Sequence, residues 1–572
     1  MGTLFSALYL GRAGLQVAQV QLDVAGHNIA SVNKEGFSRQ RALLTTRVPN
    51  LTTYGVLGRG PTIKSIQRIR DPLLDLVYRT QASSLGSAEV VSAFYSQVED
   101  VFLEPAEGGL SDRLSVFFDA LGDFSTGVEE LPVRVSTLAE CEALASGLNQ
   151  VAQRLTVLRT NANEEVYSLV AEINSITEQV AELNTAIRKM ELVGDTASDL
   201  RDDRDVLLDE LSSLLRVTVR EQEDGQVTVL VGGDELISSA GVRELEAFRD
   251  ATIDPSRSDL YGVRFTSSGR PLTIDGGQLD GTLYMRDVAI PEVQDQLDQM
   301  AAAIIESANQ IQSQGRGFTA IGAAIDSTNA VSGAGTALNS ADLPFTLTDG
   351  SFDIVVYDGT GAIAETVTVN ITATGPLAGQ TTLIDVETAI NTGTNISATV
   401  NADGTLTITP AAGYSFMFSN DTANALPALG LNGLFTGDSA ATIAVSQHLL
   451  DDPSLLSSSY SQDLLNTGDN EAALALAGLR SATILAGGEQ TVDDFYEATI
   501  VQIGIDARAN EEELDVAAAF VDDADQRRLE NSGVNLDEEV TSLVLFQRAY
   551  EASARVITVT DRMLDALMGL VG

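Results

Sequence analysis

The stretch LDEEVTSLVLFQRAYEASARVITVTDRMLDALMGLV, residues 536–571, decides the fold of this chain. Mostly apolar residues recur here at alternating spacings of four and three. They form one apolar seam along a helix about 54 Å long, at ~1.5 Å per residue. Asn535 or Asp537 is the expected cap of this helix. A lone helix cannot bury such a seam, so it needs a partner. The predicted assembly residues of this C-terminal seam are Leu536, Val540, Leu543, Tyr550, Ile557, Leu564 and Met568.

The first 30 residues carry the same alternation. Small residues at Gly11, Ala18 and Ala25 would admit a closely packed helix. We therefore predict that the two terminal helices pack on each other and on the terminal helices of neighbouring copies. The alternative is that each helix docks separately on the body of the chain. The predicted assembly residues of the N-terminal seam are Leu4, Leu8, Leu15, Leu22 and Ile29.

The middle of the chain changes character twice. Residues 72 to about 315 are mostly helical in pattern, most clearly from Leu155 to Met190. Residues 318–440 are rich in Thr, Gly, Asp and Asn and alternate apolar with polar residues, which is typical of short strands. The predicted fold class is mainly α with β, in an elongated multi-domain chain whose terminal helices form a coiled coil. The predicted domains are residues 1–34 with 533–572 (inner tube), residues 35–317 with 441–532 (mainly helical, with a small β element near 216–240), and residues 318–440 (an inserted all-β domain).

Charge is distributed unevenly along the 572 residues. The formal net charge is −47, which disfavours nucleic acid and anionic membrane as partners. The first 70 residues hold nine basic and two acidic residues, a net charge of +7, so the remainder carries −54. The basic arm, residues 34–70, is predicted to meet the acidic surface of another copy; the alternative is that it folds back on its own chain. The arm residues expected to make these contacts are Arg39, Arg41, Arg68 and Arg70.

Residues that carry chemistry are few. The single cysteine, Cys141, lies in an alanine-rich helical run and is expected to be buried. The chain has two histidines and no spacing typical of a zinc site. The acidic segment DLRDDRDVLLDE at 199–210 is expected to make ion pairs with its own arginines. We predict no enzyme, no cofactor and no metal. No apolar run approaches the ~18 residues of a membrane span, and no cleaved signal peptide is expected.

The segment after the first helix carries a recognisable motif. Its matching positions are Ala13, Gly14, Leu15, Leu22, Asn28, Ile29, Ala30, Asn33, Gly36 and Phe37. This pattern resembles the N-terminal segment of bacterial flagellar axial proteins, the rod, hook and hook-associated proteins. The run GFSRQR (36–41), followed by GRGPTIKSIQRIRDPLLD and later mid-chain segments, is similar to the hook-associated members. His27, Ser31 and Lys34–Glu35 depart from the family pattern.

The resemblance implies a structural protein that forms the junction ring between hook and filament. Its expected partners are other copies of itself, the hook protein, a second hook–filament junction protein, a flagellar export chaperone and the type III export apparatus. The expected location is the flagellum, outside the cell, after export in an unfolded state without signal cleavage. Two alternatives remain: another axial protein of the hook or distal rod, and a secreted adhesin that uses the β insertion.

Overall fold

The computed structural model describes residues 2–52, 55–102, 108–192 and 196–571. The chain forms two compact units. The first consists of Met1–Ala93, Asn161–Asp287 and Arg508–Gly572, and the second consists of Phe94–Thr160 and Val288–Ala507. The predicted fold class, mainly helical with smaller sheets, is confirmed. The predicted division into three domains stays a prediction.

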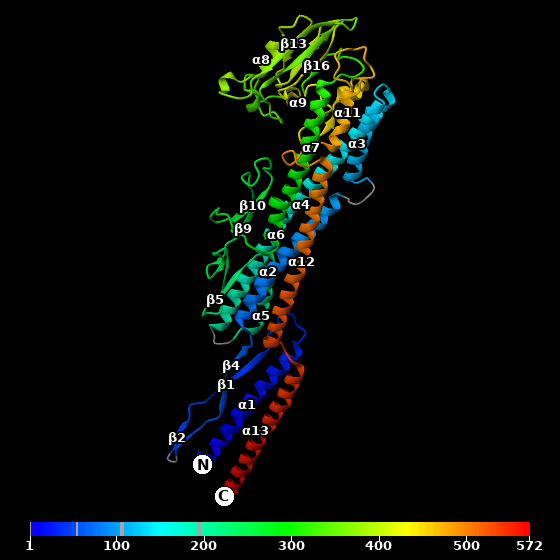
Figure 1. Ribbon diagram of the computed structural model, residues 1–572. Coiled ribbons are helices and arrows are strands. Elements are labelled where there is room, and N and C mark those ends of the chain that lie inside the picture. Colours follow the sequence, from blue (N-terminus) through cyan, green and yellow to red (C-terminus); the bar gives the residue numbers. More distant parts are fainter. Residues whose placement is uncertain (1, 53–54, 103–107, 193–195, 572) are drawn as a thin grey trace. The chain divides into compact units, whose positions relative to one another are not determined.

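The two ends of the chain form the longest continuous contact of the first unit. Helix α1 spans Gly2–Ala30 and helix α13 spans Leu536–Val571, and they pack along each other (Figure 1). The Oδ1 atom of Asn535 accepts the backbone N–H of Asp537 at 3.0 Å and so caps α13. The predicted pairing of the terminal helices is therefore confirmed.

A β-ribbon follows α1 where the sequence pattern indicated no strands. Strand β1, Gln40–Thr46, pairs antiparallel with β4, Pro61–Arg68, and Gln40 lies opposite Arg68. A bulge between Leu43 and Leu44 shifts the register. The short strands β2, Asn50–Thr52, and β3, Gly55–Leu57, form a second ladder. Most of the basic arm is thus an extended ribbon beside α1 (Figure 1).

The rest of the first unit surrounds an apolar core. Its residues come from α4, α5 and the strands that follow, and include Val166, Ile173, Leu208 and Val229. The other helices of this unit are most of α2 (Pro72–Phe102), the later part of α4 (Leu131–Glu191), α5 (Ser198–Leu214), α6 (Gln278–Tyr284) and the later part of α12 (Val492–Ser532). The strands are β5 (Thr218–Glu221), β6 (Val227–Val231), β7 (Asp234–Ser238) and β8 (Gly241–Val242), which form one sheet in that order, and the pair β9 (Leu245–Arg249) and β10 (Tyr261–Phe265).

The second unit combines helices with the strand-rich insertion. The helices are α3 (Leu110–Thr126), the earlier part of α4, α7 (Ile290–Gln314), α10 (Gln447–Asp451), α11 (Glu471–Gly478) and the earlier part of α12. A turn of π-helix, Met285–Ala289, precedes α7, where Pro291 has no N–H to donate. Four short 3₁₀ turns span Leu338–Ser340, Leu377–Gly379, Pro453–Leu455 and Leu479–Ser481.

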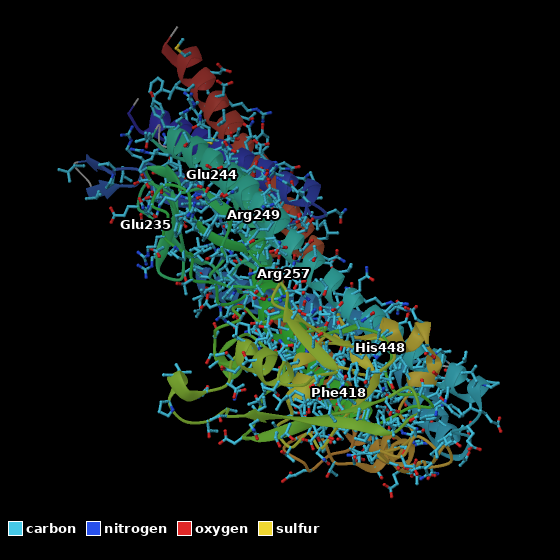
Figure 2. All side chains as sticks on the ribbon, turned by 90° about the horizontal axis from the view of Figure 1, so that it is seen from above. Glu235, Glu244, Arg249, Arg257, Phe418 and His448 are labelled. Atoms are coloured by element: carbon cyan, nitrogen blue, oxygen red, sulfur yellow. The ribbon has the colours of Figure 1, made fainter. Side chains whose placement is uncertain are left out.

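The insertion holds the expected strands and also two helices. One sheet has the order β13 (Ile363–Ile371), β12 (Gly350–Tyr357), β16 (Ser415–Ser419), and the other has the order β11 (Ile325–Asp326), β15 (Leu406–Pro410), β14 (Ile396–Val400). A two-stranded ladder joins β17 (Phe435–Thr436) to β18 (Ala444–Val445). Phe352, Phe416 and Phe418 pack edge to face in its core, and Figure 2 labels Phe418.

The helices of the insertion are α8 (Leu383–Ile390) and α9 (Ala425–Leu429). Helix α8 begins with a reciprocal capping box between Thr382 and Asp385, and it buries Leu383, Val386 and Ile390. This local signal outweighed the alternation of the surrounding strands, so the insertion is not built of strands alone.

Candidate assembly interface

Small residues let α1 and α13 approach closely. A Cβ atom built on Gly11 would lie 2.9 Å from the Cγ1 of Ile557, and one built on Gly14 would lie 2.7 Å from the Oγ of Ser553. Ala18 and Ala25 are each 2 % exposed. The centre of this contact is thus formed by the small residues of the N-terminal seam, against the larger residues of α13.

The larger residues of both seams remain partly or fully uncovered. Leu8, Leu15, Leu22 and Ile29 on α1, and Leu543, Ile557 and Leu564 on α13, are half-buried. The side chain of Leu4 lies outside the described residues. On α13, Val540 is 52 % and Met568 is 75 % exposed, and Leu536 and Tyr550 are also exposed. The role of these residues at an interface between copies stays a prediction.

Further apolar residues lie outside the predicted seams and are exposed. A single seam at alternating spacings of four and three does not include these residues. A helix that is apolar on more than one side needs more than one neighbour. The sequence signal was available as apolar residues at positions between those of the seam. These residues are Phe5, Tyr9 and Leu10 on α1, and Val544, Leu545, Val556, Val559, Met563 and Leu567 on α13.

The motif residues after α1 join the two termini. Asn28, which is 1 % exposed, accepts the backbone N–H of Gln40 at 2.9 Å and donates to the backbone oxygen of the same residue at 3.0 Å. Its amide also donates to Glu539 on α13 at 3.2 Å. A buried amide with all these partners holds the entry of the β-ribbon against the start of α13.

Gly36 and Phe37 form the turn between α1 and the ribbon. Gly36 has φ = +72°, a conformation that L residues rarely adopt, and a Cβ atom there would lie 2.2 Å from the Cγ2 of Val206 on α5. The ring of Phe37 meets the ring of His27 edge to face, with centroids 5.3 Å apart. The motif glycine is therefore required both by its backbone conformation and by close packing on α5.

Three of the four arm arginines predicted to contact another copy pair within their own chain. Arg39 donates to Glu539 at 2.6 Å and to Glu538 at 2.9 Å. Arg68 donates to Asp202 at 2.9 Å and to Asp205 at 2.6 Å, and Arg70 donates to Asp75 at 2.8 Å. For these three side chains, the alternative in which the arm folds back on its own chain describes the structure. Arg41 is exposed, and no described residue pairs with it.

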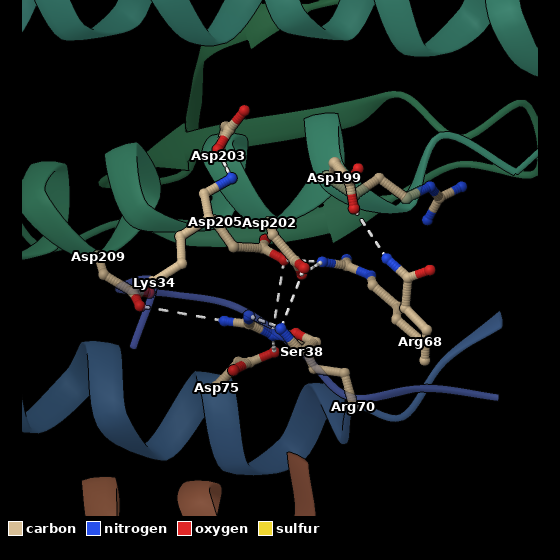
Figure 3. Close-up of polar contacts among 12 residues, drawn as sticks. Lys34, Ser38, Arg68, Arg70, Asp75, Asp199, Asp202, Asp203, Asp205 and Asp209 are labelled. Carbon is tan, nitrogen blue, oxygen red and sulfur yellow. Dashed lines mark hydrogen bonds and ion pairs between the residues drawn. The ribbon is translucent and has the colours of Figure 1, made fainter. Parts of the chain in front are cut away.

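The carboxylates that hold the arm lie on one face of α5 (Figure 3). Asp202, Asp205 and Asp209 pair with four arginines: Arg68 at the end of β4, Arg70 in the link between β4 and α2, Arg79 on α2 and Arg528 on α12. The expectation that this segment pairs with its own arginines was wrong. Arg201 pairs with Glu191 and Glu221, and the side-chain bonds of Arg204 go to the oxygens of Asn184 and Gly225.

Burial makes these charges depend on one another. Burial alone would raise the pKa of Asp205, but the guanidinium groups of Arg68, Arg70 and Arg79 hold that pKa well below its usual range. Burial raises the pKa of Asp202, although the N–H of Ser38 and the charge of Arg68 oppose the rise. This network holds the arm against its own chain. It is stable only while both the carboxylates and the guanidinium groups are charged.

Groups suited to chemistry are scattered in the described part of the chain. Cys141 is fully buried, as expected, and burial raises the pKa of its thiol. His27 lies 3.4 Å from Asp199, and His448, labelled in Figure 2, lies 3.2 Å from the amide oxygen of Asn432. Within the residues the structure describes, no group of three or more His, Cys, Asp or Glu side chains could hold a metal ion. None of the described helices is long and apolar enough to cross a membrane.

Known proteins are similar to this chain along its whole length. The family described as flagellar hook-associated protein FlgK helical domain matches residues 95–325, and the family described as flagellar basal body rod FlgEFG protein C-terminal matches residues 525–570. The chain is 27 % identical to flagellar hook-associated protein 1 of Bacillus subtilis (strain 168) over 582 residues, which cover 100 % of this chain and 99 % of that protein. It is 26 % identical to flagellar hook-associated protein 1 of Escherichia coli (strain K12), over 98 % of each chain.

A solved structure of the flagellar hook junction protein FlgK from Burkholderia pseudomallei covers 80 % of this chain and 99 % of that chain, with 18 % identity and a TM-score of 0.49.

The sequence matches define the class first: the protein is a structural component of the bacterial flagellum. Within that class, the chain is similar to the flagellar hook-associated proteins, both over the helical domain at residues 95–325 and over nearly the full length of the two relatives named above.

Proposed function

We propose that copies of this chain form the ring that joins the hook to the filament, and that the pair α1–α13 is the part through which the copies assemble. The observation that carries the proposal is the uncovered apolar surface on both helices of the pair. In the described chain, α1 exposes Phe5, Tyr9 and Leu10, and α13 exposes Val540 and Met568. A pair that is already formed still lacks cover for these side chains, and neighbouring pairs in a closed ring would supply it.

Two of the uncovered apolar residues lie near opposite ends of α13. Val540 and Met568 are 28 positions apart, which is four heptads, so they share the side of the helix that a neighbour would meet. Burial of apolar surface contributes roughly 25 cal/mol per Å² removed from water. Several such side chains per copy, repeated around a ring, therefore give a cooperative driving force for assembly.

The proposed partners follow from this placement and from the similarity of the chain to flagellar hook-associated proteins. Copies of the chain meet one another through the terminal pairs, and the ring meets the hook protein on one side and a second junction protein on the other. Export takes place in an unfolded state through the flagellar type III apparatus. Before assembly the exposed side of α13 would be covered by an export chaperone, because a helix with uncovered apolar residues is prone to aggregate.

Of the four arm arginines predicted to contact another copy, Arg41 is the one without an ion-pair partner among the described residues. It is exposed on β1, whereas Arg39, Arg68 and Arg70 are engaged within the chain. The acidic balance of the remaining chain offers a neighbour of opposite charge. We infer that Arg41 helps to set the register between copies rather than to stabilise the monomer.

The experiment replaces exposed seam residues without touching the monomer core. In cells that carry only the double variant Val540→Asp, Met568→Asp, we expect bare hooks and filament protein shed into the medium. The purified variant should unfold at the same temperature as the original chain. The matched control is Leu465→Asp in the second unit, an apolar residue that is 89 % exposed. Normal filaments in the double variant would refute the proposed assembly surface.

A further inference from the structure

A cavity of about 360 Å³ lies in the first unit, between the end of β4, the starts of α2 and α5, and strands β5 and β6. Leu76, Val217 and Val219 form part of its wall. Three carboxylates also line it, those of Asp75, Asp205 and Glu221. Against them stand five arginines: Arg68, Arg70, Arg79, Arg201 and Arg204. A surplus of positive groups around one cavity is unusual in a chain with a net charge of −47.

Four of these arginines pair with carboxylates, and three of them, Arg201, Arg79 and Arg70, do so through Nε. Arg201 uses Nε and Nη2 on the two oxygens of Glu191, at 2.7 and 2.9 Å. Arg79 uses the same two nitrogens on Asp209 at 2.7 Å and on Asp205 at 3.2 Å. Arg70 uses Nε on Asp75 at 2.8 Å. These side chains frame the cavity, and the carboxylates hold them in place.

Arg204 and Arg68 are different, because each bonds through one terminal nitrogen. Nη1 of Arg204 donates to the amide oxygen of Asn184 at 3.1 Å and to the backbone oxygen of Gly225 at 2.7 Å. Nη1 of Arg68 donates to Asp202 and Asp205. Among the described residues, the Nε and Nη2 atoms of both guanidinium groups have no acceptor. That edge of a guanidinium is the one that binds a carboxylate or phosphate through two parallel hydrogen bonds.

The burial of Arg204 makes its free edge costly. The side chain is 1 % exposed, and no described carboxylate forms an ion pair with it. Burial lowers the pKa of Arg204 to about 10; the charges of Asp205 and Glu221 oppose this fall, and those of Arg201 and Arg68 add to it. A buried cation without a counter-ion is unfavourable, and an anion placed between Arg204 and the free edge of Arg68 would supply that counter-ion and reduce the repulsion between the two guanidinium groups.

We propose that this cavity is a binding site for a small oxyanion, preferably a dianion, held between the Nε–Nη2 edges of Arg68 and Arg204. Inorganic sulfate or phosphate and a short dicarboxylate share the required chemistry. The apolar wall formed by Leu76, Val217 and Val219 leaves room for the aliphatic chain of a dicarboxylate. A bound anion would connect β4 to α5 and to the turn between β5 and β6, and would thereby fasten the basic arm to the first unit.

The test is thermal unfolding and isothermal titration of the full chain with sulfate, phosphate or succinate, against chloride at constant ionic strength. We expect a saturable rise in the unfolding temperature and one site per chain. A stronger effect of succinate would identify an organic ligand, and a stronger effect of sulfate or phosphate would identify an inorganic one. Either result supports the site, whereas no saturable effect of any of the three overturns it.

Variants locate the site. Arg68→Gln removes one free edge from a side chain that is 13 % exposed, and Arg204→Lys keeps the charge but removes the planar edge. Both should weaken binding about tenfold or more. Arg59→Gln, which changes an exposed arm arginine outside the cavity, should bind as the original chain does. If Arg204→Lys does not fold, Arg68→Gln alone decides. Unchanged binding in Arg68→Gln overturns the proposal.

Discussion

The Nε atom of Arg39 lies 2.6 Å from the carboxylate of Glu539, across 500 positions of the sequence. Glu539 is almost fully buried, and its second oxygen accepts the amide of Asn28. One carboxylate at the start of α13 therefore receives both a charged and a neutral donor from the N-terminal segment. The two ends of the chain are joined by this contact as well as by helix packing.

Arg39→Ala should destabilise the free chain. It leaves the Glu539 carboxylate buried with only the Asn28 amide as a side-chain donor, and such breaks cost about 3 kcal/mol when one partner of a buried pair is removed. Urea unfolding measures the loss. The double variant Arg39→Ala, Glu539→Gln should recover part of it, because the unpaired charge is gone. Glu538→Gln is the matched control, and it should cost less than about 1 kcal/mol because Glu538 is 60 % exposed. Equal losses in Arg39→Ala and Glu538→Gln would show that the pair with Glu539 is unimportant.

Gly36→Ala should also destabilise the chain, for a backbone reason. Alanine at φ = +72° is strained, and its methyl group would lie against Val206, so a loss of about 2 kcal/mol or more is expected. The control is Gly26→Ala in α1, where a Cβ atom has no neighbour within 4 Å and helix propensity improves by about 1 kcal/mol. Denaturant unfolding should thus move in opposite directions for the two glycines. A shift of the same sign for both would contradict the proposed turn geometry.

The Asp205 network should make stability depend on acid. The folded pKa of Asp205 is depressed, so its contribution is fully present above the unfolded value of about 3.9 and is lost as the pH falls further toward the folded value. Asp205→Asn should cost about 3 to 5 kcal/mol at pH 7, because it leaves several arginines without their shared carboxylate. The difference in unfolding free energy between the original chain and this variant should shrink steadily below about pH 4.

Asp202 has the opposite effect on how the unfolding free energy depends on pH. Its raised pKa means that the folded chain gains stability as this carboxyl becomes protonated, so a plain pH profile mixes the two effects. The difference between the two chains at each pH removes this contribution to a first approximation. A difference that stays constant from pH 7 to pH 3 would exclude Asp205 as the source of the acid sensitivity.

Helical periodicity made the terminal helices predictable, because each seam repeats over many turns. The helix α13 begins at Leu536 and ends at Val571, which are the bounds of the stretch predicted to be helical. Strands β9 and β10 were missed, although Tyr261, Val263 and Phe265 alternate as a strand requires. Each strand has only five residues, and a run that short cannot outweigh the helical pattern on both sides of it.

The polar contacts could not be predicted, since their partners are far apart in sequence. Asp209 forms ion pairs with Arg79, which is 130 positions away in the sequence, and with Arg528, which is 319 positions away. The sequence shows that α5 is acidic and that the arm is basic, but it does not show that they meet within one chain. For the same reason the arm was equally compatible with a neighbouring copy. Of the four arginines predicted to make that contact, Arg41 alone has no ion-pair partner among the described residues.

The close contact between α1 and α13 leads to a prediction about assembly. Gly11→Val would place a branched side chain against Ile557 and the backbone oxygen of Ser553, and so would force the two helices apart. We expect faster hydrogen exchange in α1 and loss of attached filaments in cells that carry only this variant. Gly26→Val is the matched control, because it adds the same side chain to the same helix at a position with open space. Attached filaments in Gly11→Val, or equal defects in both variants, would show that assembly does not depend on the close approach of the terminal helices.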